Sequence, residues 1–198
     1  MKYKEFIIAT NNAGKQREYE EMLSPLGIKV HSLKEMNIDI DVDENGLTYE
    51  ENSYLKAKAI RELVDMPVIA DDSGIEIASM GNHFPGIYSA RYAKENGGYP
   101  AVFDLINKEI QGKDRSAEFH CCICYLEEKD STPKYFKGIC KGRLLEKPVG
   151  QGGFGYDPLF HFEEGNLDFG TCSANEKNHC SHRYNALKKF ADYLIKEA

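Results

Sequence analysis

Short apolar runs that suit β-strands alternate with segments of helical periodicity along the whole chain. The helix-like segments repeat apolar residues three and four positions apart, whereas the strand-like runs are continuous or alternating. The expected strands cover residues 3–10, 28–32, 67–70, 75–78, 119–126 and 135–140. The expected helices cover residues 15–26, 48–63, 99–110 and 181–196. Leu63 is expected on the inner face of the second helix and Leu105 on that of the third. This mixture predicts an α/β protein, and the strand-rich later part favours a mixed sheet over a purely parallel one.

Size and charge limit the class of protein. The chain fits one domain over residues 1–198, or one domain with two lobes. Its formal net charge of −7 disfavours a nucleic-acid binder, which needs a basic stripe to displace counterions. A few local cations can still hold a phosphate chain in an acidic protein. Because no apolar run approaches the length of a signal-peptide core or a membrane span, we expect a cytoplasmic protein without a membrane partner.

The six cysteines do not indicate a metal site. Cys121 and Cys124 form a C-x-x-C pattern inside an expected strand, where residues three apart point to opposite faces. The spacing of His179, Cys180 and His182 matches no common zinc pattern. We therefore expect small, buried, reduced thiols.

A polar segment, residues 10–15, joins the first expected strand to the first expected helix. A strand-to-helix connection offers backbone N–H groups and the positive end of the helix dipole, which suits phosphate. Gly14 permits close approach and Lys15 adds a point charge. The candidate phosphate ligands are Thr10, Asn11, Asn12, Ala13, Gly14 and Lys15. The alternative is an ordinary N-capped helix start, since the Walker A pattern is absent.

Two adjacent carboxylates follow the apolar run at residues 67–70. Asp71-Asp72-Ser73-Gly74 is expected to form an acidic turn at a strand end. Neighbouring carboxylates repel, so such a pair is usually tolerated only near a cation or hydrogen-bond donors. Oxygen ligands of this kind suit Mg²⁺. One carboxylate could hold the metal while the other orients or deprotonates a water molecule, and a solvated surface turn is the alternative.

A glycine-rich segment at residues 150–160 contains G-x-G-x-x-G, but Asp157-Pro158 prevents the helix that a dinucleotide-binding motif requires. The glycines instead predict a loop whose backbone can approach a flat ligand. Phe154 or Tyr156 could stack on a base, and Asp157 could accept hydrogen bonds from ring N–H groups.

A cluster of donors precedes the last expected helix. Lys177, His182 and Arg183 lie near its start, which Ser181 would cap. Such a position suits a carbonyl or phosphate oxygen.

Taken in order, these segments resemble the inosine/xanthosine triphosphatase family of non-canonical purine nucleoside triphosphate pyrophosphatases. The matching positions are Thr10, Asn12, Lys15, residues 70–74, residues 85–92, residues 152–158, Phe160, Glu176, Lys177 and residues 181–183. The resemblance implies an elongated mixed-sheet α/β fold flanked by helices, with two lobes, a central substrate cleft and a homodimer. It implies Mg²⁺-dependent hydrolysis of ITP, dITP and XTP between the α- and β-phosphates, which yields the nucleoside monophosphate and pyrophosphate.

The resemblance also implies residue roles. Asp72 would be the general base and a Mg²⁺ contact, residues 10–15 would hold the phosphates, and Ser73 would touch substrate. The implied contacts of the purine are Phe154, Gly155, Tyr156, Asp157, Lys177, His182 and Arg183. The family's metal-binding glutamate falls at Asp43-Glu44 in this chain, and either residue could be the ligand.

Substrate selection has a physical basis in this family pattern. Buried donors would favour a 6-oxo purine, because a 6-amino group would leave them unpaired at a cost of ~1–3 kcal/mol each. A non-catalytic nucleotide sensor on the same scaffold is the second hypothesis. The presence of Asp71, Asp72 and Lys15, which a sensor could lack, favours the enzyme.

Overall fold

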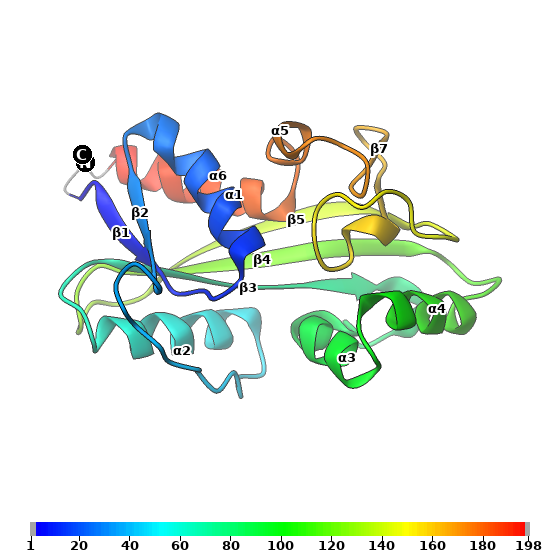
Figure 1. Cartoon of the computed structure of the whole chain (residues 1–198), viewed down its shortest axis with the longest axis horizontal. Helices are drawn as coiled ribbons and strands as arrows, with labels where there is room; N and C mark the ends of the chain where they lie inside the picture. Colours follow the sequence, from blue (N-terminus) through cyan, green and yellow to red (C-terminus); the bar gives the residue numbers. More distant parts are fainter. Residues whose placement is uncertain (1–2, 197–198) are drawn as a thin grey trace. The chain divides into compact units, whose positions relative to one another are not determined.

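The computed structural model describes residues 3–196, and its strands form one mixed sheet. The strand order is β2-β1-β3-β4-β5-β6-β7 (Figure 1). The strands are β1 (Glu5–Ile8), β2 (Lys29–Ser32), β3 (Val68–Ile77), β4 (Ser116–Leu126), β5 (Lys134–Leu144), β6 (Phe160–Phe162) and β7 (Leu167–Asp168). Strand β1 pairs in parallel with β2 and β3, whereas β6 pairs antiparallel with β5 and β7. The predicted α/β class and mixed sheet are confirmed.

Six α-helices accompany these strands in the described part of the chain. They are α1 (Ala13–Leu23), α2 (Tyr49–Arg61), α3 (Ser89–Glu95), α4 (Tyr99–Glu109), α5 (Ala174–Lys177) and α6 (His182–Lys196). The four long ones were expected. Helices α3 and α5 and strands β6 and β7 were not, because segments of two to seven residues are too short to show a period. No helix within residues 3–196 combines the length and the apolar character that crossing a bilayer requires.

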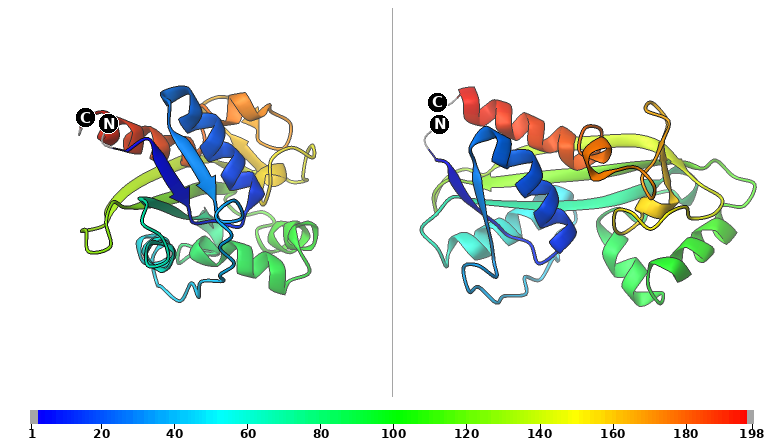
Figure 2. Two further views of the ribbon diagram at one scale, coloured as in Figure 1. Left: turned by 60° about the vertical axis from the view of Figure 1, so that its left-hand side comes forward. Right: turned by 45° about the horizontal axis from the view of Figure 1, so that its top comes forward.

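The chain divides into two compact units, which are described separately. Unit 1 comprises the described residues of Met1–Asp72, Cys121–Gly138 and Arg183–Ala198, and unit 2 comprises Ser73–His120 and Ile139–His182. In unit 1, α1 and α6 lie side by side on one face of the strands and α2 lies on the other (Figures 1 and 2). In unit 2, α3 and α4 cover one face of the strands (Figure 1).

Strand alternation explains the two apolar layers of unit 1. Phe6 and Ile8 of β1 and Ile69 of β3 pack with Tyr19 of α1 and Phe190 of α6. The residues between them in the strands pack against α2 instead. This second layer includes Ile7, Val68, Ala70, Ala57 and Ile60. Because both faces are covered, β1 is a continuous apolar run rather than an alternating one.

The inner faces of two helices differ from the expected ones. Leu63, expected to face inward, is 58% exposed and follows the end of α2, whose buried face is formed by Asn52, Ser53, Ala57 and Ile60. In α4 of unit 2, Leu105 is 42% exposed and Phe103 is buried in its place. Apolar spacing does not predict the buried face of α2, because the buried polar residues Asn52 and Ser53 form part of that face.

The expectation of an acidic turn at residues 71–74 is wrong. Asp71-Asp72-Ser73-Gly74 is not a turn at a strand end, because β3 runs without interruption from Val68 to Ile77. Gly74 does not serve a turn either. A Cβ atom at Gly74 would lie 2.0 Å from the carbonyl oxygen of Gly86, so glycine is required for close backbone packing.

Candidate active site

The two aspartates of β3 point to opposite faces of the strand, because successive side chains alternate. Asp71 points, like Ile69, toward α1 and α6, whereas Asp72 points, like Ala70, toward α2. The adjacent carboxylates therefore have separate surroundings. This arrangement limits the repulsion that the sequence suggested.

Asp71 is buried against cations. Its Oδ2 atom lies 3.0 Å from Lys15 Nζ of α1 and 3.0 Å from a guanidinium nitrogen of Arg183 in α6. Burial by itself raises the pKa of Asp71, but the charges of Lys15 and Arg183 outweigh burial and hold the pKa far below its usual value. Asp71 is therefore ionised in the folded protein and fastens both helices to β3.

Arg183 completes a buried charge network in unit 1. Its side chain is 1% exposed and also donates to Glu18 of α1. Two carboxylates and two cations, Glu18, Asp71, Lys15 and Arg183, thus compensate one another. The described partners of Arg183 include the carboxylates of Glu18 and Asp71. Its contact with a purine base stays a prediction.

The segment before α1 is an N-capped helix start with an exposed loop. Asn12 is the N-cap, and its Oδ1 accepts from the backbone N–H groups of Gly14 at 2.9 Å and Lys15 at 3.1 Å. Thr10 Oγ1 accepts from the N–H of Asn12 at 3.2 Å. Asn11 and Ala13 are exposed. The N-capped helix start, which was the alternative to a phosphate site, is therefore present. The exposure of residues 11–13 is also compatible with phosphate binding at this loop.

Asp72 lies in a different environment on the α2 face. Its Oδ2 accepts from Asn52 Nδ2 at 3.2 Å, and its Oδ1 lies 3.7 Å from Lys56 Nζ. Burial raises the pKa of Asp72, and the positive charges of Lys56 and Lys15 only partly oppose it. A buried carboxylate with a raised pKa is a better proton acceptor than an ordinary surface aspartate.

The two candidate metal ligands before α2, Asp43 and Glu44, have different surroundings. Glu44 Oε2 lies 3.0 Å from Lys56 Nζ, so Glu44 and Asp72 face the same ammonium group. Asp43 is exposed. Within residues 3–196, no three His, Cys, Asp or Glu side chains are arranged to hold a metal ion. Two carboxylates nevertheless fit Mg²⁺, which commonly takes one or two protein carboxylates and completes its coordination with water and substrate phosphates.

In unit 2, the base-site candidates Phe154, Asp157 and Lys177 form one group, in which Asp157 and Lys177 are buried and Phe154 is half-buried. Lys177 Nζ lies 2.6 Å from Asp157 Oδ2 and 4.6 Å from the centre of the Phe154 ring. The backbone N–H of Phe154 donates to the same Asp157 oxygen at 2.7 Å. Gly153 has a φ of +68°, and a Cβ there would lie 2.1 Å from Asp157 Oδ2. The glycine therefore allows the loop to close around this carboxylate.

The other candidates of unit 2 are placed as follows. His182 is buried and stacks on Phe119 with ring centres 4.7 Å apart. Tyr156 belongs to the apolar core and donates its hydroxyl to the backbone oxygen of Ser89 at 2.9 Å. Because Tyr156 is buried and Phe154 is half-buried, the structure favours Phe154 as the ring for stacking. Gly155 and Ser73 are half-buried.

Two residues of the α2 face were missed in the sequence. Asn52 and Lys56 both contact Asp72, and they lie four positions apart on one helix face. The signal that could have identified them is this i, i+4 polar pair in a helix directly before the Asp71-Asp72 segment. Their spacing alone did not separate them from solvated surface residues.

The cysteines are free thiols. Cys121 packs in the α1/α6 layer and Cys124 in the α2 layer, so the expected separation of the C-x-x-C pair is confirmed. Cys121, Cys122, Cys124 and Cys140 are buried, whereas Cys172 and Cys180 are half-buried.

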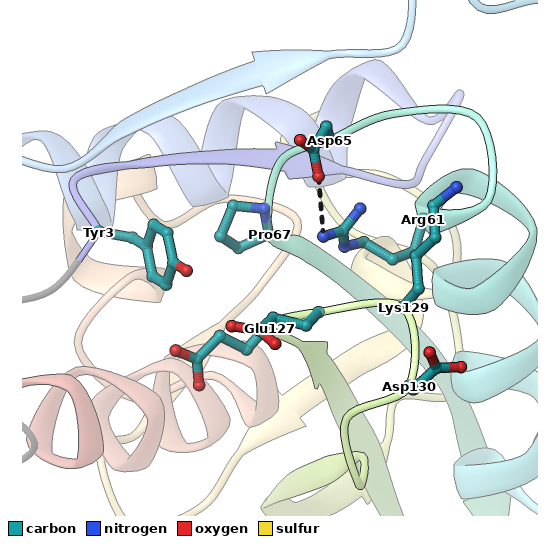
Figure 3. Close-up of a pocket in the computed structure, with 8 residues that line it drawn as sticks. Tyr3, Arg61, Asp65, Pro67, Glu127, Lys129 and Asp130 are labelled. Carbon is teal, nitrogen blue, oxygen red and sulfur yellow. Dashed lines mark hydrogen bonds and ion pairs between the residues drawn. The ribbon is translucent and has the colours of Figure 1, made fainter.

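Unit 1 also contains a pocket of about 500 Å³ whose lining does not include Asp71 or Asp72 (Figure 3). Its lining residues are Tyr3, Arg61, Asp65, Pro67, Glu127, Glu128, Lys129 and Asp130. Acidic residues outnumber basic ones, and Arg61 already bonds Asp65 at 3.4 Å. No predicted site residue lines this pocket, and its charge does not suit a triphosphate.

Comparison with known proteins places the chain among close relatives. A sequence model of the Ham1 family matches residues 6–193. A Bacillus subtilis protein named dITP/XTP pyrophosphatase is 40% identical over 194 residues, which cover 96% of this chain and 97% of the relative. A Clostridium perfringens protein of the same name is 42% identical, with 96% and 97% covered. The solved structure of the Staphylococcus aureus Ham1 protein is 38% identical with a TM-score of 0.84, covering 98% of this chain and all of that one.

Proposed function

Because the chain belongs to the Ham1 family, we propose that it hydrolyses non-canonical purine nucleoside triphosphates, namely ITP, dITP and XTP. The products are the nucleoside monophosphate and pyrophosphate. The observation that carries this proposal is the buried carboxylate of Asp72, which faces Lys56 together with Glu44. It occurs in a chain about 40% identical, over nearly its full length, to proteins named dITP/XTP pyrophosphatase.

In the proposed reaction, Asp72 is the general base that accepts a proton from the attacking water. Its raised pKa supports this role, since a base works best when its pKa approaches the working pH. Residues 10–15 contact the phosphate chain through the exposed loop and Lys15. The ion pair with Asp71 holds the Lys15 ammonium in place.

Mg²⁺ is part of the proposal, with Asp72 and Glu44 as its protein ligands. The support is the donor set, two carboxylates that face one cation, with Asp43 exposed. A bound Mg²⁺ would supply positive charge to the phosphate oxygens. Lys56 offsets the negative charge of the two carboxylates.

Unit 2 is proposed to contact the base. Phe154 stacks on the purine, while Lys177 and His182 donate to its 6-oxo group. The ion pair with Asp157 supports this by fixing the Lys177 ammonium beside the Phe154 ring. Gly155, Asp157 and Ser73 remain proposed substrate neighbours, and the proposal includes a cytoplasmic homodimer.

The test is a panel of ITP, dITP, XTP, ATP and GTP incubated with Mg²⁺, with pyrophosphate and orthophosphate measured separately. We expect pyrophosphate from ITP, dITP and XTP and much slower release from ATP. Orthophosphate as the first product would contradict cleavage between the α- and β-phosphates. Binding of ITP without turnover would instead identify a nucleotide sensor. Omitting Mg²⁺ in the presence of a chelator should abolish turnover.

A further inference from the structure

Asn52 is a fully buried polar side chain of α2 that joins two parts of the proposed site. Its Nδ2 donates to Asp72 Oδ2 at 3.2 Å, while its Oδ1 accepts from the backbone N–H of Gly46 at 2.8 Å. One amide group therefore contacts the proposed base and the loop that carries Glu44. All these residues belong to unit 1.

The contact between this loop and α2 is tight. A Cβ atom at Gly46 would lie 2.7 Å from Asn52 Oδ1 and 2.7 Å from Glu51 Cβ. The next backbone N–H, that of Leu47, donates to Glu51 Oε2 at 2.6 Å. Thr48 caps the helix by accepting from the N–H of Glu51 at 3.1 Å. The loop is thus fastened to the first turn of α2 at several points.

The chemistry of the site requires an amide at this position. Asp72 needs a donor and the Gly46 N–H needs an acceptor, and an amide side chain supplies both. Aspartate could accept from Gly46 but could not donate to Asp72 when ionised. Leucine, of similar volume, could do neither and would leave buried groups unpaired.

Asn52 and Lys56 contact different oxygens of Asp72. The amide occupies Oδ2, and Oδ1 faces Lys56, one helical turn beyond Asn52 on the same side of α2. Lys56 in turn holds Glu44, two residues before Gly46. Asn52 therefore contacts the carboxylate of Asp72, and Lys56 contacts the carboxylates of both Asp72 and Glu44.

We infer that Asn52 is a positioning residue for hydrolysis, whose side-chain amide holds Asp72 in its working orientation and secures the Glu44 loop. The inference rests on the proposed function, because it assigns Asn52 to the same site. Asn52 acts through Asp72 and the loop. Its loss should therefore lower kcat more than it raises KM.

The experiment compares Asn52→Leu and Asn52→Asp with wild type in pyrophosphate release from ITP, with kcat and KM measured separately. The matched control is Ser53→Ala. Ser53 is equally buried on the same helix, but it bonds the Glu50 carbonyl and Cys122 rather than Asp72. We expect kcat to fall about 10- to 100-fold in both Asn52 variants, with KM changed less than about threefold, as for groups that orient a site's ligands. Ser53→Ala should retain the wild-type kcat.

Hydrogen exchange of the backbone segment around Gly46 and thermal unfolding separate positioning from simple folding. Asn52→Asp keeps an acceptor for the Gly46 N–H, so the loop should stay protected while kcat falls. In Asn52→Leu, protection of the loop should be lost as well. A folded Asn52→Asp with wild-type kcat would overturn the inference. So would equal losses of kcat in Ser53→Ala. If wild type itself released no pyrophosphate from ITP, the proposed function would fail instead.

Discussion

At the scale of single residues, the face of β3 on which a carboxylate lies decides its role. Asp71 is ionised, and its Oδ2 contacts both Lys15 and Arg183, which suits a structural anchor. Asp72 has one amide donor, a more distant ammonium and a raised pKa, which suits a proton acceptor. Two adjacent residues of the same type therefore have different expected functions.

Replacing each aspartate should separate these functions. Asp72→Asn should lower kcat for ITP by about 10²- to 10⁴-fold, the range of general-base catalysis, while ITP binding and unfolding change little. Asp71→Asn should lower the free energy of unfolding by about 3–5 kcal/mol, because it removes one of two carboxylates from the buried network while both cations, Lys15 and Arg183, remain. Denaturant unfolding, ITP titration and pyrophosphate release are the measurements. Wild-type turnover in Asp72→Asn would remove Asp72 from the base role.

Truncation of the proposed stacking ring should affect binding more than chemistry. Phe154→Ala removes a half-buried ring, whereas the Asp157–Lys177 ion pair remains. We expect KM for ITP to rise about 10-fold, equivalent to about 1.4 kcal/mol and within the ~1–3 kcal/mol typical of base–aromatic stacking, with a smaller effect on kcat. Tyr135→Ala, an exposed aromatic residue outside the site, is the control. An unchanged KM would show that Phe154 does not stack on the base.

The sequence identifies Asp71, Asp72, Lys15 and Asp157 as candidates, because polar groups next to apolar runs or glycines stand out. It was not sufficient to find Asn52 or Lys56. Their importance depends on which face of α2 is buried, and that face follows from packing rather than from apolar spacing. Arg183 was predicted from the sequence as a substrate contact, and the structure places its side chain beside Asp71 of β3 and Glu18 of α1. These partners lie more than one hundred positions away, so the local sequence could not indicate them.

At the scale of elements, β3 shows how tertiary contacts override local propensity. Aspartate, serine and glycine favour turns, so residues 71–74 were expected to end a strand. In the folded protein each carboxylate finds donors on its own side of the strand, and Gly74 packs directly on Gly86. The continuous strand thus depends on partners that a local sequence pattern does not contain.

A methyl group at Gly74 tests this explanation. Gly74→Ala should destabilise the protein by about 1–3 kcal/mol or more, because the added Cβ would overlap the backbone of Gly86 and crowd Ser89 Oγ. Ser73→Ala, one position earlier, should cost about 1 kcal/mol or less. Thermal or denaturant unfolding provides the comparison. Equal stability of Gly74→Ala and wild type would show that Gly74 is not needed for close packing.

At the scale of the whole molecule, the reactivity of the cysteines can report on folding. Burial raises the pKa of the Cys122 and Cys124 thiols to about 12, and it raises the pKa of Cys121 and Cys140 as well. At pH 8 a thiol with such a pKa is about one part in ten thousand thiolate, and the thiolate is the reactive form. These four side chains should therefore resist alkylation while the protein is folded.

Mass spectrometry after iodoacetamide treatment at pH 8 should find Cys172 and Cys180 modified first. The four buried thiols should react only at the rate of unfolding, and all six should react in denaturant. Modification of Cys121 or Cys124 in the folded protein as fast as that of Cys172 would contradict their burial. The order of labelling also measures the integrity of both core layers of unit 1.

The opposite orientation of Asp71 and Asp72 makes β3 sensitive to changes in chain length. A one-residue insertion or deletion just before Asp71 would interchange the faces of all following side chains in the strand. The anchor carboxylate would then meet Lys56, and the proposed base would meet Arg183. Point substitutions can weaken one partner at a time, whereas a single-codon indel here would exchange both at once. Natural and engineered length variation should accordingly be confined to the loops on either side of this strand.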